Sequence, residues 1–139
     1  MLNNWFVLGV GSSLCFASMV LVYKKLFMMG IKPLVLNLFI FGFVFLGFMI
    51  WNISTKTTPN LNLKMILLLL LAAAFSLAGN YFDTTSLKLA PNPGYATTLK
   101  ATQIIFISLL APIFFRSSLG LVPFVGIILV LLGVFLVSR

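Results

Sequence analysis

The stretch that decides the fold is MILLLLLAAAFSLAGNYF, residues 65–82. It carries no charged side chain and comes close to the ~20 residues with which a helix crosses the ~30 Å hydrocarbon layer of a membrane. Because hydrocarbon offers no partners to backbone N–H and C=O groups, a spanning segment must be a helix or part of a closed barrel. The run does not alternate apolar with polar residues, so it predicts a helix.

Four similar runs make up most of the remaining chain. Of 139 residues, 62% are hydrophobic and 7% charged, against roughly 45–50% apolar and 25% charged residues in soluble domains. The start of the chain is uncharged and its first run has full length, which favours a retained helix over a cleaved signal peptide. We predict an all-α integral membrane bundle of five transmembrane helices, a single domain over residues 1–139, with helices at about 5–25, 33–51, 64–89, 94–115 and 118–138.

Helix-breaking and capping residues set the predicted boundaries. Gly30 and Pro33 predict a short turn between the first two helices, and Pro93 is suited to the first turn of the fourth. Ser117 and Ser118 can cap the fifth helix. These short connections predict antiparallel neighbours.

Several classes of function lack the residues that they need. The chain has no histidine and one acidic residue, Asp83, so neither a metal centre nor paired-carboxylate catalysis is expected, and we predict no enzyme and no cofactor. Its single cysteine, Cys15, cannot form an intrachain disulfide. The net charge of +8 is scattered over loops and helix ends, which indicates the lipid bilayer and its anionic headgroups rather than nucleic acid as the partner.

The basic residues divide weakly between the two membrane faces. Lys56, Lys64 and Arg116 fall on the face of the amino terminus, and the opposite face has five: Lys24, Lys25, Lys32, Lys88 and Arg139. This bias favours an outside amino terminus, and its small size also permits insertion in both orientations.

Two ionisable groups fall within predicted membrane helices, where such groups are costly and are candidates for function. Asp83 lies about six residues before the end of the third helix, and Lys100 about six residues after the start of the fourth. In an antiparallel hairpin both would lie roughly 9 Å from the turn and could pair. The alternative has Lys100 reaching the headgroups and Asp83 solvated near the surface.

The third helix has a polar face. Ser76, Asn80, Asp83 and Thr84 follow helical spacing, and Thr98 and Gln103 lie in the polar first half of the next helix. Together with Asp83 and Lys100, these residues are predicted to line a cavity for a small-molecule solute. The alternative for each hydroxyl is a hydrogen bond between helices.

Gly126 and Gly133 are two turns apart on one face of the fifth helix. Small residues allow close contact between membrane helices, so this face is the predicted interface of a homodimer. Spacing alone leaves open whether the partner is another helix of the same chain.

Over nearly its whole length the chain resembles one EamA repeat of the drug/metabolite transporter superfamily. The residues that carry the resemblance are Tyr23-Lys24-Lys25, Gly30-Ile31-Lys32-Pro33, Ser86-Leu87-Lys88-Leu89-Ala90-Pro91, Leu110-Ala111-Pro112 and the segment from Gly126 to Val134. The glycine segment also looks like the dimerising motif of small multidrug resistance proteins. Those pumps use a glutamate in the first helix, and many EamA repeats have one after the fourth-helix proline; this chain has neither.

The resemblance implies a multi-pass transporter of the bacterial cytoplasmic membrane. Relatives commonly have two repeats, so a single repeat would act as a homodimer, and an antiparallel one would reproduce the inverted repeat. The leading hypothesis is a secondary transporter of a small polar or amphipathic solute. A small membrane subunit of a lipid-linked sugar flippase is the alternative, and an ion channel is less favoured because the sequence has no filter or pore ring.

Overall fold

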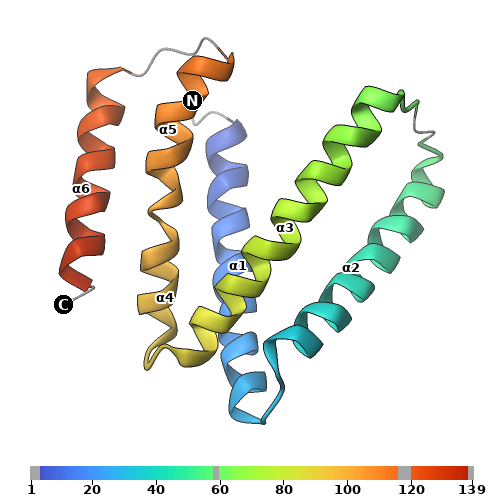
Figure 1. Cartoon of the computed structure of the whole chain (residues 1–139), viewed down its shortest axis with the longest axis horizontal. Helices are drawn as coiled ribbons and strands as arrows, with labels where there is room; N and C mark the ends of the chain where they lie inside the picture. The colour runs from blue at the N-terminus through green and yellow to red at the C-terminus, as the bar shows by residue number, and fades with distance from the viewer. Residues whose placement is uncertain (1–3, 58–59, 116–119, 138–139) are drawn as a thin grey trace. The chain divides into compact units, whose positions relative to one another are not determined.

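The computed structural model describes residues 4–57, 60–115 and 120–137, and these residues form helices and connections without strands. Figure 1 shows the helices in chain order: α1 (Asn4–Met28), α2 (Pro33–Thr55), α3 (Leu63–Leu89), α4 (Pro93–Lys100), α5 (Gln103–Phe115) and α6 (Leu121–Val137). The prediction of a helical membrane bundle is confirmed. The helices belong to two compact units, Met1–Lys88 and Leu89–Arg139, which are described separately below.

Four segments are long and apolar enough to cross a membrane: Asn4–Met28, Pro33–Thr55, Leu63–Leu89 and Pro93–Phe115, the last of which comprises α4 and α5. The fifth predicted span corresponds to α6, which has 17 residues. At 1.5 Å per residue α6 is about 25 Å long, slightly less than the ~30 Å hydrocarbon layer. The predicted cap at Ser117 and Ser118 lies outside the described residues, as do Arg116 and Arg139.

The turn between α1 and α2 forms where Gly30 and Pro33 predict it. Gly30 has a φ of +94°, a left-handed conformation that glycine adopts without a steric penalty. Backbone hydrogen bonds from Met29 N to Lys25 O (3.1 Å) and from Ile31 N to Leu26 O (3.2 Å) close the end of α1. Pro33 then occupies the first turn of α2, where its missing N–H has no cost.

A left-handed residue ends α2, and asparagine side chains cap the starts of α3 and α4. Lys56 ends α2 in the left-handed conformation with a φ of 50°. Asn62 accepts a hydrogen bond from the Met65 backbone N–H at the start of α3 (2.9 Å). At the start of α4, Asn92 accepts one from Gly94 N (2.8 Å), and Pro93 lies in the first turn as predicted.

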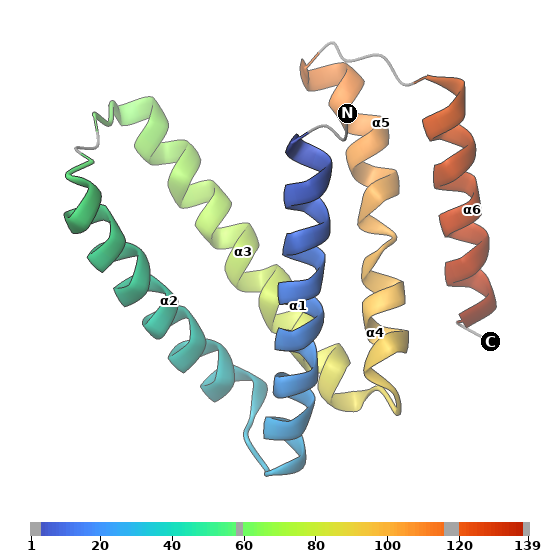
Figure 2. The ribbon, with the colours of Figure 1, turned by 180° about the vertical axis from the view of Figure 1, so that it is seen from behind.

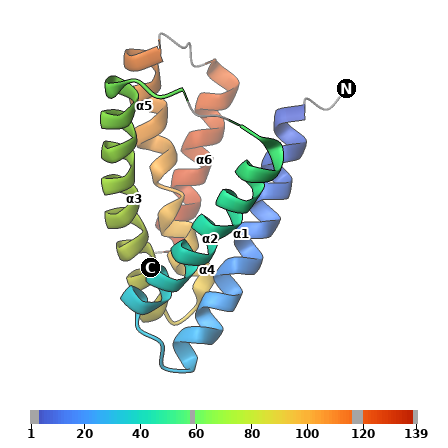
Figure 3. The same cartoon turned by 90° about the vertical axis from the view of Figure 1, so that its right-hand side faces the viewer.

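The buried residues of the first unit are confined to one end of it. They are Tyr23 and Phe27 near the end of α1, Leu36 near the start of α2, and Thr84 and Leu87 near the end of α3. From this end the three helices diverge, as the views in Figures 1 and 3 show. The remaining lengths of the helices are exposed in the isolated chain, as expected of surfaces that face lipid or another helix.

In the second unit, a short interruption separates α4 from α5 at Ala101 and Thr102, where the sequence predicts one continuous helix over 94–115. Figure 2 shows this irregular stretch between the two helices. Its backbone bonds are of the tighter i to i+3 kind: Ala101 N donates to Thr98 O (3.0 Å) and Thr102 N to Leu99 O (3.1 Å). The Thr102 hydroxyl donates to the same Leu99 carbonyl (2.8 Å), so side chain and backbone compete for one acceptor.

The second unit is held by contact between α4 and α6. Its buried side chains are Ala96 on α4 and Val134 on α6, with 4% and 8% of their surface exposed.

Candidate functional site

Thr84 is the centre of the polar contact between α2 and α3. Its side chain is 1% exposed, and its hydroxyl accepts a hydrogen bond of 2.9 Å from the Asn37 side-chain amide of α2. The hydroxyl in turn donates to Asn80 O, one turn earlier on α3 (2.7 Å). The O–H donor of Thr84 and one of its two acceptor lone pairs are therefore used inside the protein.

Asn37 is a site residue that the sequence reasoning missed. The signal that could have found it is its chemistry: it is the one amide inside the apolar run from Leu34 to Trp51, where a polar group without a partner is costly. Its nitrogen also lies 3.4 Å from Asn80 O, which can only accept. This fixes the orientation of the amide, with Nδ2 toward α3 and Oδ1 away from it.

Asn80 and Ser76 continue the polar face of α3 beyond Thr84. The Asn80 amide donates to Ser76 O (2.7 Å) and to the Ser76 hydroxyl (3.1 Å), so these side chains are connected along their own helix. Asn80 is half-buried and Ser76 exposed. Among the described residues, none donates a hydrogen bond to the side-chain oxygen of Asn80 or of Asn37, so both oxygens can accept one from another molecule.

Lys24 holds the end of α1 against the end of α3. Its ammonium group donates to the carbonyl oxygens of Leu87 (3.2 Å) and Lys88 (3.4 Å), in the last turn of α3. The last four carbonyls of a helix lack the usual i+4 partner within it, and a cation is favoured at this negative end of the helix dipole.

Asp83 is half-buried on α3, one turn before buried Leu87 and beside buried Thr84. The chain's one acidic group is thus near the contact of α1 with α3. Asp83 belongs to the first unit and Lys100 to the second, and their predicted ion pair stays a prediction.

The remaining predicted residues of the fourth helix adjoin its interruption. Lys100 is the last residue of α4 and Gln103 the first of α5, and both are exposed. Thr98 is half-buried, and its hydroxyl donates to Gly94 O one turn earlier (2.8 Å). An ammonium, an amide and a hydroxyl therefore lie within six residues of chain, on both sides of irregular backbone.

The glycines of α6 face open space within the second unit. A Cβ atom added to Gly126 or Gly133 would meet nothing within 4 Å. Around the axis of α6, this face is rotated by about 100° from the side chain of buried Val134, because successive residues of an α-helix are about 100° apart. Among the described residues no three histidine, cysteine or acidic side chains gather, so the described part of the chain offers no metal centre.

The fold and these polar residues define a multi-pass helical membrane protein whose hydrophobic helices carry hydrogen-bonding groups at membrane depth. The profile of the EamA-like transporter family matches residues 3–139, and the chain belongs to this family. It is thus a membrane protein of a transporter family, as the sequence motifs predict. Comparison with curated proteins gave no match, and comparison with solved structures gave none either.

Proposed function

We propose that this protein is a secondary transporter that moves a small polar or amphipathic solute by alternating access and acts as a homodimer of single repeats. Membership of the EamA-like transporter family supports transport in general. The solute site would lie at the interrupted span of α4 and α5.

The interruption at Ala101 and Thr102 is the observation that carries this proposal. Irregular backbone at membrane depth is tolerated only where protein buries it or where it lines a water-filled cavity. Transporters commonly bind their substrates at such discontinuous helices. Lys100 and Gln103 adjoin the interruption, and Lys100 lies about 10 Å along α4 from Pro93, at 1.5 Å per residue.

The chemistry of the proposed site suits a polar solute with both donors and acceptors. The Lys100 ammonium can donate, and the Gln103 amide can both donate and accept. In the first unit, Asp83 is the one acidic side chain of the sequence and is the residue best suited to bind a cation or a proton.

A homodimer would supply the second half that a single repeat lacks. Apolar helices exposed along most of their length need lipid or another protein surface as a partner. The face of α6 that carries Gly126 and Gly133 is open, so a second chain can approach it without a steric clash. An antiparallel pair would give the inverted arrangement of a two-repeat transporter.

The test is exchange of a broad set of labelled solutes in liposomes that contain the purified protein, with and without a pH gradient. We expect uptake of at least one polar solute, loss of uptake in Lys100→Met, and retention of uptake in Ser54→Ala. Ser54 is a suitable control because it is exposed near the end of α2 and its hydroxyl bonds only to Ile50 O of its own helix (3.0 Å).

Absence of uptake under every condition would contradict the transporter proposal and favour a small subunit of a flippase complex. Normal uptake in both Lys100→Met and Asp83→Asn would instead contradict the proposed site while leaving transport in place.

A further inference from the structure

Four lysines lie at the end of the first unit where its buried residues are. Lys24 and Lys25 are near the end of α1, Lys32 immediately precedes α2, and Lys88 is in the last turn of α3. The hydrogen bonds from Lys24 to the last turn of α3 show that the ends of α1 and α3 are adjacent. The turn of residues 29–32 connects α2 to the same end.

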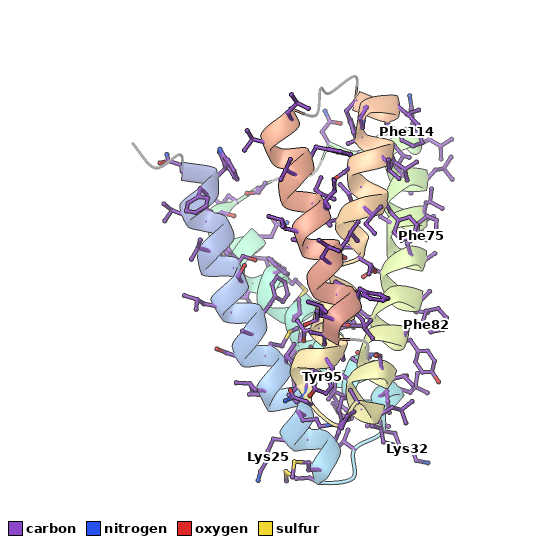
Figure 4. The ribbon with its side chains drawn as sticks, turned by 90° about the vertical axis from the view of Figure 1, so that its left-hand side faces the viewer. Lys25, Lys32, Phe75, Phe82, Tyr95 and Phe114 are labelled. Atoms are coloured by element: carbon purple, nitrogen blue, oxygen red, sulfur yellow. The ribbon has the colours of Figure 1, made fainter. Side chains whose placement is uncertain are left out.

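These lysines divide into one that faces inward and three that face outward. Lys24 is half-buried because its ammonium group binds the α3 carbonyls. Lys25, Lys32 and Lys88 are exposed, and their ammonium groups donate to no other described residue. Figure 4 shows Lys25 and Lys32 on either side of the turn between α1 and α2, with side chains directed away from the helices.

The positive charge of this surface is not neutralised by the chain itself. Asp83 is the single acidic residue of the sequence, so its one negative charge cannot offset three exposed lysines. Apolar side chains accompany the lysines, since Met28 and Met29 are 76% and 70% exposed. Cationic groups beside exposed apolar groups, at the end of membrane-spanning helices, match the boundary between lipid headgroups and acyl chains.

We propose that Lys25, Lys32 and Lys88 form a binding surface for the headgroups of anionic phospholipids. Each lysine near an anionic membrane surface contributes about fivefold in affinity, so three lysines would favour an anionic over a zwitterionic lipid by about 100-fold. Lys24 does not belong to this surface, although it is adjacent to Lys25 in sequence, because the α3 carbonyls hold its ammonium group.

The test measures lipid bound to the intact protein in neutral detergent by native mass spectrometry. The two probes are phosphatidylglycerol and phosphatidylcholine with the same acyl chains. The reference is a Lys56→Gln/Lys64→Gln variant, because these exposed lysines near the other ends of α2 and α3 would otherwise bind anionic lipid themselves. Adding Lys25→Gln, Lys32→Gln and Lys88→Gln to this reference should lower the preference for phosphatidylglycerol by tenfold or more.

Two further variants make the test specific. Lys24→Gln should lower the unfolding temperature, because it removes the hydrogen bonds to the α3 carbonyls. It should change the lipid preference by less than about twofold, compared with about fivefold for each lysine of the surface. Wild-type protein should also lose its preference as salt rises, because exposed charges are screened. If the triple variant does not fold, Lys25→Gln and Lys32→Gln alone should each show the fivefold loss.

Three results would overturn the proposal. One is an unchanged lipid preference in the folded triple variant or in both single variants. Another is a loss of preference in Lys24→Gln as large as that in Lys25→Gln. The third is displacement of bound lipid by soluble glycerol phosphate at the same concentration, because this would indicate a site for free phosphate esters rather than for a membrane surface.

Discussion

The hydrogen bond between Asn37 and Thr84 gives the sharpest test of how α2 and α3 are held together. Thr84→Val keeps the shape of a side chain that is 1% exposed but removes the hydroxyl that accepts the Asn37 amide at 2.9 Å. Asn37 would then retain only the long contact of 3.4 Å to Asn80 O. Hydrogen bonds between membrane helices contribute about 0.6 kcal/mol on average and up to about 1.7 kcal/mol. A partly buried amide without a good partner adds a penalty of about 1 kcal/mol.

We therefore expect Thr84→Val to lower the free energy of unfolding by about 1–2 kcal/mol, and Asn37→Leu to lower it by a similar amount. The double variant has no unsatisfied group left at this contact, so its loss should be about 1 kcal/mol smaller than the sum of the single losses. Unfolding in mixed micelles with increasing dodecyl sulfate, followed by circular dichroism, measures all three values.

Thr85→Val is the matched control for this cycle. Its hydroxyl donates to Tyr81 O within its own helix, α3 (2.7 Å). The control should change the free energy of unfolding by less than about 0.5 kcal/mol, as for most substitutions away from a buried network. Strictly additive losses in Asn37→Leu and Thr84→Val, or an equal loss in Thr85→Val, would refute the role of this hydrogen bond.

Three further predictions concern the proposed site, the dimer and the topology. If Asp83 and Lys100 form an ion pair, Asp83→Asn and Lys100→Met should each lower the thermal stability. The double variant should then lose less stability than the sum of the two single losses, whereas additive losses would exclude the pair. Gly126→Ala and Gly133→Ala fit the isolated chain, since an added Cβ meets nothing within 4 Å. Reduced crosslinking of dimers in these variants would therefore indicate that the glycines contact a second chain. Unchanged crosslinking even in Gly126→Leu would place the dimer interface elsewhere. Reporter fusions at the two termini should report opposite sides of the membrane for five spans, and two cytoplasmic ends in every molecule would refute that count.

Strong local signals made much of the fold predictable from the sequence. Gly30 permits a positive φ, and Pro33 lacks the N–H that a helix interior would use. Both effects are local to the residue, so the turn between α1 and α2 can be predicted without knowing how the helices pack. The same holds for Pro93 at the start of α4. Apolar length then identifies the membrane segments, because the bilayer requires it.

The missed features depend on geometry that composition does not encode. No glycine or proline marks the interruption at Ala101 and Thr102, where a threonine hydroxyl competes with the backbone for the Leu99 carbonyl. Asn37 and Thr84 are 47 residues apart, so only the packing of α2 against α3 reveals that they bind each other. The polar face of α3 was visible from spacing, and a hydrogen bond between helices was the stated alternative for its hydroxyls, but spacing identified neither Thr84 as the one that makes it nor Asn37 as its partner.

The concentration of buried residues at one end of the first unit has a mechanical consequence. Tyr23, Leu36 and Leu87 are packed there, while the far ends of their helices have no comparable core. From Tyr23 to Asn4 the free part of α1 is about 28 Å long at 1.5 Å per residue, so a rotation of about 10° at the packed end displaces its tip by about 5 Å. A small tilt of a helix about the packed end, near Thr84, would therefore move its far end much more than the residues around Thr84 themselves.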